Sequence, residues 1–377
     1  MSDTQKHTKP NVPNLRFPGF EGEWARCTLG EIGEPYIGLT YSPADVVNEG
    51  GTIVFRSSNI QNGEIDYSDI VRVNKKIKDS IITRKDDLLI CARNGSPRLI
   101  GKNALLKDAD AGQTFGAFML VFRSNDNHFV HQLLSTKGYY SQVSENLGAR
   151  INQITTSNIK DFEFYFPKSI AERNKIADFL NLIDERISIQ NKVIEKYESL
   201  IKALAHEIIG KNAPNKTLSE CVCCTSSILK ESDLEEAGAV PVYGAAGISG
   251  FTERALTMGD SVLITKDGSG IGSLRYVSGP HSFVGTLNSM TPKDGVYLPY
   301  IYYALQNVCF ESYRTGQAIP HIFFKDYGKE TIYCPSFNDQ KRLAKGLEMI
   351  DARIEIDRAA LQALQSAKVY LLSAMFI

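Results

Sequence analysis

Apolar residues recur along two long stretches of the chain in steps that alternate between four and three residues. This spacing is typical of the seam of a coiled coil, and it predicts two long helices, at 169–212 and 336–377. Each seam has polar interruptions. The first seam runs through Ile176, Leu180, Ile183, Ile187, Gln190, Ile194, Tyr197, Ile201, Leu204 and Ile208, and the second through Leu343, Leu347, Ile350, Ile354, Asp357, Leu361, Leu364, Lys368, Leu371 and Met375.

Two such seams in one chain would most simply bury each other. We therefore expect the two helices to pair as an antiparallel coiled coil, and the alternative is that each packs on its own globular neighbour. Gln190 and Asp357 lie near the middle of each seam. In an antiparallel pair they either meet and fix the register, as single polar seam residues do in other coiled coils, or reach solvent at a loosened crossing.

The helices belong to an internal repeat. The segment Gly148-Ala149-Arg150-Ile151-Asn152-Gln153-Ile154 returns 168 residues later as Gly316-Gln317-Ala318-Ile319-Pro320-His321-Ile322. A Pro, 167 or 335, follows each copy and closes a strand-like run. Each helix then begins with Ser three residues before an acid, Ser169 with Glu172 and Ser336 with Asp339, which is a capping-box pattern.

The segments before the helices, 13–168 and 213–335, are rich in Gly, aromatic and β-branched residues and in short strand-like runs. One element is common to both. Asp87-Leu88-Leu89-Ile90, followed by Arg93-Asn94-Gly95-Ser96, matches Asp260-Ser261-Val262-Leu263, followed by Lys266-Asp267-Gly268-Ser269. We predict that a buried strand delivers a cation and a Gly-Ser turn at the same point of each domain.

These patterns predict an α+β protein with two mixed α/β domains, each followed by a long helix, and with pseudo-twofold symmetry. The expected boundaries are a disordered tail at 1–12, a first domain at 13–168, a central helix at 169–212, a second domain at 213–335 and a distal helix at 336–377. Because the two heads have diverged while the helices have not, one scaffold would present two different specificities.

Charge and composition add little to this picture. The net charge is −1, so contact with nucleic acid would depend on local basic patches. We find no secretory leader and no apolar run long enough for a membrane span. Seven cysteines, an odd number, favour a reducing cytoplasm. The cluster Cys221–Cys224 lacks the second ligand pair of a zinc site, so we expect a strand carrying thiols and no metal.

Glycine-rich turns do not complete a nucleotide-binding motif. The turn at 95–103 has five residues between its glycines and Asn103 in place of Ser or Thr, and 268–272 lacks the dinucleotide spacing. We find no methyltransferase, nuclease or hydrolase motif and no metal-spaced histidine pair. We therefore expect no catalytic residue in this chain.

Polar and cationic residues in the turns of the two heads are the candidates for DNA contacts. Arg and Lys suit guanine, and Asn and Gln suit adenine. The candidates in the first head are Arg56, Ser57, Asn59, Arg93, Asn94, Ser96, Arg98, Lys102, Arg150, Asn152 and Gln153, and those in the second are Tyr243, Lys266, Ser269, Arg275, Asn288, Arg314, Gln317 and His321.

The chain resembles the specificity subunits of bacterial type I restriction–modification enzymes. The likeness is carried by the opening at 13–24 (Pro-Asn-Leu-Arg-Phe-Pro-Gly-Phe-Glu-Gly-Glu-Trp), the Gly-x-x-Ile-x-x-Ile element, the helix start at 177–184 and Val240-Pro241-Val242-Tyr243-Gly244. It covers nearly the whole chain. One departure is that Arg173 and Asn174 stand where relatives often have Glu-Gln, while the second helix has Gln340.

The resemblance implies a non-catalytic DNA-binding subunit in the cytoplasm. Each head would read one half of a split, asymmetric site in double-stranded DNA, and the helices would set the gap between the halves. Two methyltransferase subunits would bring S-adenosylmethionine, and two restriction subunits would use ATP and Mg²⁺, so this chain itself would hold no cofactor. The alternatives are a coiled-coil adaptor with two heads that bind ligands other than DNA, or a fragment of a single-chain modification enzyme.

Overall fold

The computed structural model describes residues 11–147, 152–317 and 319–377, and it divides the chain into two compact units. The first unit combines 1–190 with 360–377, and the second comprises 191–359. Each unit therefore contains one head and one segment of each long helix. The predicted domain boundaries remain predictions, and the tail predicted at 1–12 lies almost wholly outside the described residues.

The two long helices are α5 (Ile170–Ala205), which ends in a π turn at His206–Gly210, and α9 (Phe337–Met375). Their starts form only half of the expected capping box. Ser169 Oγ accepts the N–H of Glu172 at 3.3 Å, and Ser336 Oγ accepts the N–H of Asp339 at 3.3 Å. The Glu172 carboxylate is bound instead by Arg16, a partner that the local pattern does not reveal.

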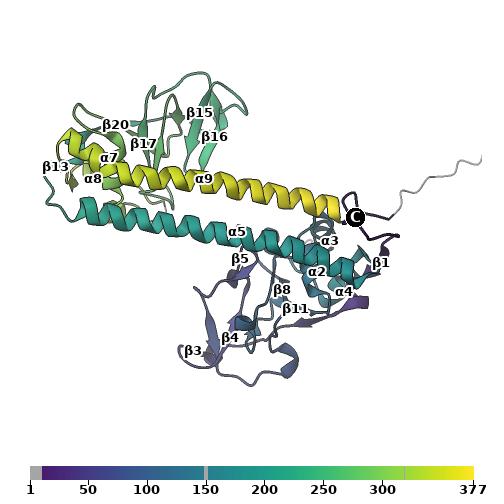
Figure 1. Ribbon diagram of the computed structural model, residues 1–377. Helices are drawn as coiled ribbons and strands as arrows, with labels where there is room; N and C mark the ends of the chain where they lie inside the picture. Colours follow the sequence, from purple (N-terminus) through teal and green to yellow (C-terminus); the bar gives the residue numbers. More distant parts are fainter. Residues whose placement is uncertain (1–10, 148–151, 318) are drawn as a thin grey trace, which may run out of the picture. The chain divides into compact units, whose positions relative to one another are not determined.

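The first head is built around a four-stranded antiparallel sheet in the order β2-β11-β8-β9, beside a second sheet in the order β10-β4-β7-β3 (Figure 1). Its strands are β1 (Ala25–Thr28), β2 (Glu34–Ile37), β3 (Val46–Val47), β4 (Thr52–Phe55), β5 (Ile60–Gln61), β6 (Glu64–Ile65), β7 (Val71–Val73), β8 (Leu88–Cys91), β9 (Asn103–Leu105), β10 (Thr114–Phe115), β11 (Met119–Arg123) and β12 (Glu163–Phe166). Its helices before α5 are α1 (Leu29–Ile32), α2 (Asn127–Leu133), α3 (Lys137–Asn146) and α4 (Thr156–Asp161).

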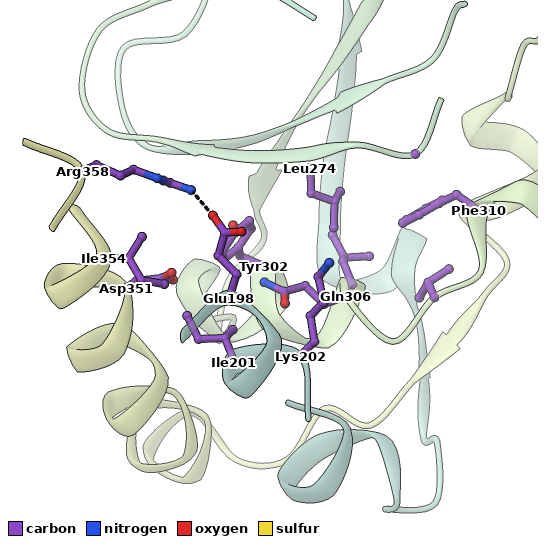
Figure 2. Close-up of a pocket in the computed structure, with 13 residues that line it drawn as sticks. Glu198, Ile201, Lys202, Leu274, Tyr302, Gln306, Phe310, Asp351, Ile354 and Arg358 are labelled. Carbon is purple, nitrogen blue, oxygen red and sulfur yellow. Dashed lines mark hydrogen bonds and ion pairs between the residues drawn. The ribbon is translucent and has the colours of Figure 1, made fainter. Parts of the chain in front are cut away.

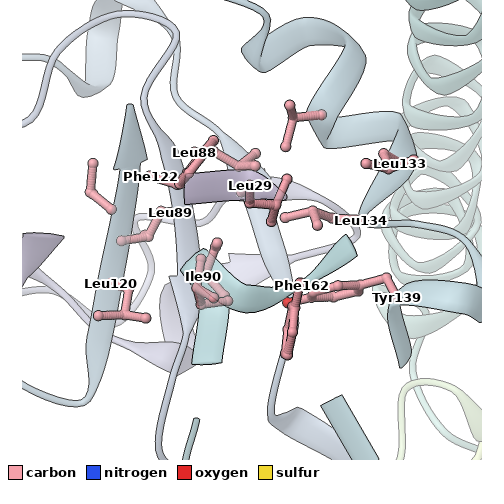
Figure 3. Packing of buried hydrophobic residues seen from close by; sticks show 14 of the residues in the cluster. Leu29, Leu88, Leu89, Ile90, Leu120, Phe122, Leu133, Leu134, Tyr139 and Phe162 are labelled. Carbon is pink, nitrogen blue, oxygen red and sulfur yellow. The ribbon is translucent and has the colours of Figure 1, made fainter. Parts of the chain in front are cut away.

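The core of the first unit joins this sheet to the helices. Strand β8 is buried along its whole length, as its uninterrupted apolar run requires. Figure 3 shows Leu88, Leu89 and Ile90 of this strand among the side chains of the core. The same cluster includes residues of α5 and of the end of α9, so the head and its helix segments share one core.

The second head repeats this topology. Its four-stranded antiparallel sheet has the order β14-β20-β17-β18, and a smaller sheet has the order β16-β15-β19. Its strands are β13 (Lys216–Thr217), β14 (Val222–Ser226), β15 (Val240–Gly244), β16 (Gly247–Thr252), β17 (Ser261–Thr265), β18 (Leu274–Val277), β19 (Ser282–Phe283), β20 (Leu287–Pro292) and β21 (Thr331–Ile332). Its helices are α6 (Leu218–Cys221), α7 (Leu298–Leu305) and α8 (Phe324–Tyr327).

The backbone hydrogen bonds give the register of the repeat, and they correct the sequence match by one residue. Cys91 O accepts the N–H of Gly101 at 2.9 Å, and Thr265 O accepts the N–H of Gly272 at 2.8 Å. Cys91 therefore corresponds to Thr265. It follows that Arg93 corresponds to Asp267, and that the residue corresponding to Lys266 is Ala92. The expectation of a cation at equivalent turn positions was wrong, because the sequences alone do not show where each strand ends.

Within each unit, segments of the two long helices run in opposite directions (Figure 1). In the first unit, Ile176 and Leu180 share a core with Leu372 and Met375, and Asp184 pairs with Lys368. In the second unit, an ion pair joins α5 to α9, from Glu198 Oε1 to Arg358 Nη2 at 2.6 Å.

The predicted fold class is confirmed: two heads of mixed α/β structure are each followed by a long helix. No helix in the described part of the chain is both long enough and apolar enough to cross a membrane.

Candidate nucleic-acid interface

In the first head, the turn after β8 is bonded to the start of the segment that leads into α4. Ala92 O accepts the N–H of Ile154 at 2.9 Å, and Asn152 O accepts the N–H of Asn94 at 3.3 Å. Arg93 and Gln153 form an isolated antiparallel bridge. The two motifs that the repeat analysis singled out thus meet at one place, which we call the first junction (residues 92–96, 118 and 152–154).

In the second head, the same two motifs meet through the same bonds. Lys266 O accepts the N–H of Ile322 at 2.9 Å, and Pro320 O accepts the N–H of Gly268 at 2.9 Å. Asp267 and His321 form the corresponding bridge. We call this the second junction (residues 266–269 and 320–325). Gly268 has a φ of 93°, a left-handed conformation that glycine adopts without strain, so the turn needs glycine here.

The side chains of the first junction hold its loops in place and leave one cation exposed. Asn152 Nδ2 donates to Gly95 O at 3.0 Å, and Asn94 Nδ2 donates to Ser57 Oγ at 2.9 Å. The exposed guanidinium of Arg93 lies over the ring of Phe118, 4.8 Å from its centroid. The amide contacts stiffen the loops, and within the described residues the Arg93 guanidinium makes no hydrogen bond or ion pair, so its donors can reach a ligand.

The second junction carries different chemistry on the same backbone. His321 Nδ1 pairs with the carboxylate of Asp267, and the His321 ring lies 4.0 Å from that of Phe323. Lys325 Nζ lies 5.0 Å from the centroid of the same phenyl ring. The two junctions therefore share a backbone frame and differ in the side chains that they carry.

The predicted DNA contacts fall into four groups by exposure. Exposed residues are Arg93, Arg98, Ser269, Arg275, Arg314 and Gln317. Half-buried residues are Arg56, Ser57, Asn94, Ser96, Lys102, Asn152, Gln153, Tyr243, Lys266 and His321. Asn59 and Asn288 are buried, and Arg150 lies outside the described residues. The junctions bring together Arg93, Asn94, Ser96, Asn152 and Gln153 in the first head and Lys266, Ser269 and His321 in the second.

Asn59 and Asn288 are structural residues, so their assignment to the DNA surface was wrong. Asn59 Nδ2 donates to Asp66 O and Asp69 O at 3.0 and 2.8 Å. Asn288 Nδ2 donates to the hydroxyl of Tyr327 at 3.0 Å. Both amides hydrogen-bond inside the fold, and a buried amide without such partners would be costly. Composition alone could not separate them from surface amides.

Two aromatic residues of the junctions were missed. Phe118 is 56% exposed and Phe323 is 42% exposed, and neither was among the predicted DNA contacts. Only the position of each residue in the sequence could have pointed to the junction. Phe118 directly precedes β11, and Phe323 follows the last Ile of the Gly-x-x-Ile-x-x-Ile element.

Two adjoining cavities of the second unit lie against its long helices and are lined by both acidic and basic side chains. One of about 1100 Å³ and an adjoining one of about 380 Å³ share Tyr302, Asp351 and Arg358 (Figure 2). The hydroxyl of Tyr303 donates to Asp351 at 2.5 Å, and burial raises the pKa of that carboxyl. Tyr243 and Arg275, two of the predicted DNA contacts, line the larger cavity together with acidic residues such as Asp351.

No group of three or more His, Cys, Asp or Glu side chains in the described part of the chain is placed to hold a metal ion. The cysteine cluster follows the expectation for a strand with thiols: Cys221 ends α6, and Cys223 and Cys224 lie on β14.

The comparison with protein families decides the identity of the fold. The family described as the type I restriction modification DNA specificity domain matches residues 21–199 and again 218–366. The chain belongs to this family. Each match contains one head and most of the helix that follows it, which agrees with the repeat seen in sequence and topology.

Individual relatives agree with this family. A type I specificity subunit of Mycoplasma genitalium is 28% identical over 252 residues, which are 61% of this chain and 65% of that protein. The specificity subunit of the type I restriction enzyme EcoKI of Escherichia coli is 27% identical over 205 residues, 52% of this chain and 44% of that one. This chain thus spans less than two thirds of either relative. The relatives are named specificity subunits, so the expectation of a non-catalytic component is confirmed at the level of the family.

A solved structure supports the fold. The crystal structure of the S subunit of a type I restriction–modification system from M. genitalium aligns with a TM-score of 0.66 at 22% identity. The alignment covers 97% of this chain and 99% of that one. The order of head, helix, head and helix is therefore that of the type I specificity subunits.

Proposed function

We propose that this chain reads a bipartite, asymmetric sequence in double-stranded DNA for a type I restriction–modification complex, one half-site with each head. The observation that supports this most strongly is the doubled junction. Both heads use the same backbone bonds to join the same two motifs, and each then presents different side chains. Base edges are distinguished by donor and acceptor pattern, so changing side chains on a fixed frame changes the sequence that is read.

The proposed partners follow from the family. Two methyltransferase subunits, which hold S-adenosylmethionine, and two restriction subunits, which use ATP and Mg²⁺, would assemble on this chain, which would serve as their scaffold. We place the complex in the cytoplasm. All seven cysteines are free thiols, which fits a reducing compartment.

Exchange of one head tests the function. The chain, purified with its methyltransferase partner and supplied with S-adenosylmethionine, should methylate one bipartite sequence, whereas the chain alone should methylate none. Replacing 213–335 with the second head of another family member should change one half-site and leave the other, because the heads have separate junctions. Sequencing of methylated adenines in a genome that carries each version is the measurement.

Two results would contradict the proposal. A change in both half-sites after the exchange would show that the heads do not read separately. Absence of any sequence preference with the methyltransferase present would favour the alternative, a coiled-coil adaptor whose heads bind ligands other than DNA.

Arg93→Ala should lower the affinity of the complex for its target by roughly 5- to 150-fold and relax one base pair, as expected for the loss of a bidentate contact to guanine worth about 1–3 kcal/mol. Lys266→Ala should weaken binding to all sequences evenly, because a lysine ammonium is a point charge that suits a phosphate. Fluorescence anisotropy on targets with single base-pair changes measures both. Arg26→Ala, which removes an exposed arginine of β1, is the control and should have no effect. If Arg93→Ala and Arg26→Ala had the same affinity and the same base preference, the first junction would not be part of the DNA interface.

A further inference from the structure

Phe118 is an exposed aromatic side chain on a rigid base. Its carbonyl accepts the N–H groups of both Ala92 and Arg93 at 2.9 Å, and the next residue, Met119, donates to Gly116 O at 2.8 Å. The backbone at Phe118 is therefore fixed on both sides, while 56% of the residue remains in contact with solvent. A rigid, exposed phenyl ring at the first junction is suited to an apolar contact with a ligand.

The Arg93 guanidinium limits what this ring can do. It lies 4.8 Å from the ring centroid and covers one face. A ring that wedges between two base pairs needs both faces, so intercalation is incompatible with this stack. The edge and the other face stay available. The stack also restricts the orientation of the guanidinium, which lowers the entropy that Arg93 loses when it binds.

The second junction has the same pairing, supplied from a different segment. Phe323 is 42% exposed, its ring lies 4.0 Å from that of His321, and Lys325 Nζ lies 5.0 Å from its centroid. Phe118 comes from the residue before β11, whereas Phe323 follows the Gly-x-x-Ile-x-x-Ile element. The two heads have thus arrived at a cation beside an exposed phenyl ring by separate routes, which points to a shared requirement of the ligand.

We propose that Phe118 reads the 5-methyl group of a thymine in the major groove, beside the base contacted by Arg93, and that Phe323 does the same in the other half-site. This inference rests on the proposed function. Thymine differs from the other bases by an apolar methyl group in the major groove, and phenylalanine contacts it without needing a hydrogen bond. A phenyl ring beside a guanidinium would therefore read a thymine next to a guanine, with one side chain for each base.

Replacing single thymines with deoxyuracil tests the methyl contact, because the two bases pair alike and differ only in that methyl group. In the complex with the methyltransferase, one such replacement in the first half-site should weaken binding by about fourfold, the value of one buried methyl-sized group. Phe118→Ala should bind the thymine and uracil targets equally, and Phe118→Leu, which stays apolar, should retain part of the discrimination. Fluorescence anisotropy of each target measures the effect.

Two further variants separate this effect from a general loss of structure. Phe323→Ala should lose discrimination only in the second half-site, and Ile170→Ala, which truncates a 62%-exposed residue at the start of α5, should lose none. The fluorescence of Trp24 in a thermal scan should show that Phe118→Ala is folded. If sequence-specific binding is intact but no thymine replacement depends on Phe118, the methyl contact is overturned and the proposed function stands. If no sequence is preferred, the proposed function fails and this inference fails with it.

Discussion

Arg16→Ala should destabilise the first unit by about 3–5 kcal/mol, the cost of removing one partner of a buried ion pair. Arg16 holds Glu172 through two bonds, from Nε to Oε1 at 2.7 Å and from Nη2 to Oε2 at 2.9 Å. The Glu172 side chain is only 2% exposed, and its other donor is Trp24 Nε1 at 3.3 Å. Without Arg16, a carboxylate would remain buried with one weak partner.

The chain supplies its own probe and control for this experiment. Trp24 is the single tryptophan and contacts Glu172, so its fluorescence during urea unfolding reports on the first unit alone. Arg26→Ala removes an arginine of the same head whose ion pair with Glu163 is exposed, and it should cost less than about 1 kcal/mol. If Arg16→Ala and Arg26→Ala lowered the free energy of unfolding by the same amount, burial would not determine how much the Arg16–Glu172 ion pair stabilises the unit. Arg16→Met with Glu172→Met should recover most of the stability, because a buried ion pair replaced by apolar side chains is often neutral.

This pair also explains the opening motif on which the family resemblance partly rests. In this segment, at 13–24, Arg16 and Trp24 meet on the first turn of α5, and Leu15 donates its N–H to Ala374 O at 2.8 Å, close to the end of α9. The segment therefore ties together the two helix ends that belong to the first unit.

The helices were the most predictable part of the chain. A seam of apolar residues depends only on helical periodicity, which the sequence displays directly. None of the sixteen residues that we assigned to the helix interface is exposed. Their assignment as contacts between the two helices remains a prediction for each of them, including Gln190 and Asp357.

The departure at Arg173 shows what residue types alone could not reveal. Arg173 donates from Nη1 to Pro167 O at 2.7 Å and from Nε to Asp126, just before α2. In the repeat, Gln340 donates to Pro335 O at 2.8 Å and accepts the N–H of Tyr297, just before α7, at 2.8 Å. Arg173 and Gln340 thus make equivalent links, each from the proline before its long helix to the residue before a helix of its own head. The function of the position is conserved within the chain, although the residue is not.

The candidate site was predicted less well, for physical reasons. Both motifs of each junction were found, since they recur in the sequence, but their contact depends on the path of the chain between them. Asn59 and Asn288 were misplaced because an amide serves equally well inside a loop and on a surface. Phe118 was missed because hydrophobicity normally predicts burial, and a functional exposed aromatic residue breaks that rule.

The stability of the first unit should fall as the pH is lowered from about 6.5 to about 4, and His131 should be a main cause. The pKa of His131 is lowered to about 4, mainly by burial; Asp184 opposes this shift, and Lys368 and His128 contribute to it. Asn103 donates its amide to Gly101 O and Leu134 O, so its Oδ1 faces the imidazole, and His131 Nδ1 donates to it at 3.0 Å. This contact fixes a proton on Nδ1, which leaves Nε2 as the nitrogen that gains a proton when the ring becomes charged.

The sign follows from proton linkage. Between pH 6.5 and 4 the unfolded chain binds a proton at His131 and the folded chain does not, so the free energy of unfolding decreases as the pH falls, by up to about 3 kcal/mol. His131→Gln should remove that part of the decrease, whereas His128→Gln, which changes an exposed neighbour, should keep it. Urea unfolding followed through Trp24 at pH 7, 5.5 and 4 measures the difference. A pH dependence unchanged in His131→Gln would mean that the pKa of His131 is the same in the folded unit as in the unfolded chain, and that its burial does not disfavour the charged ring.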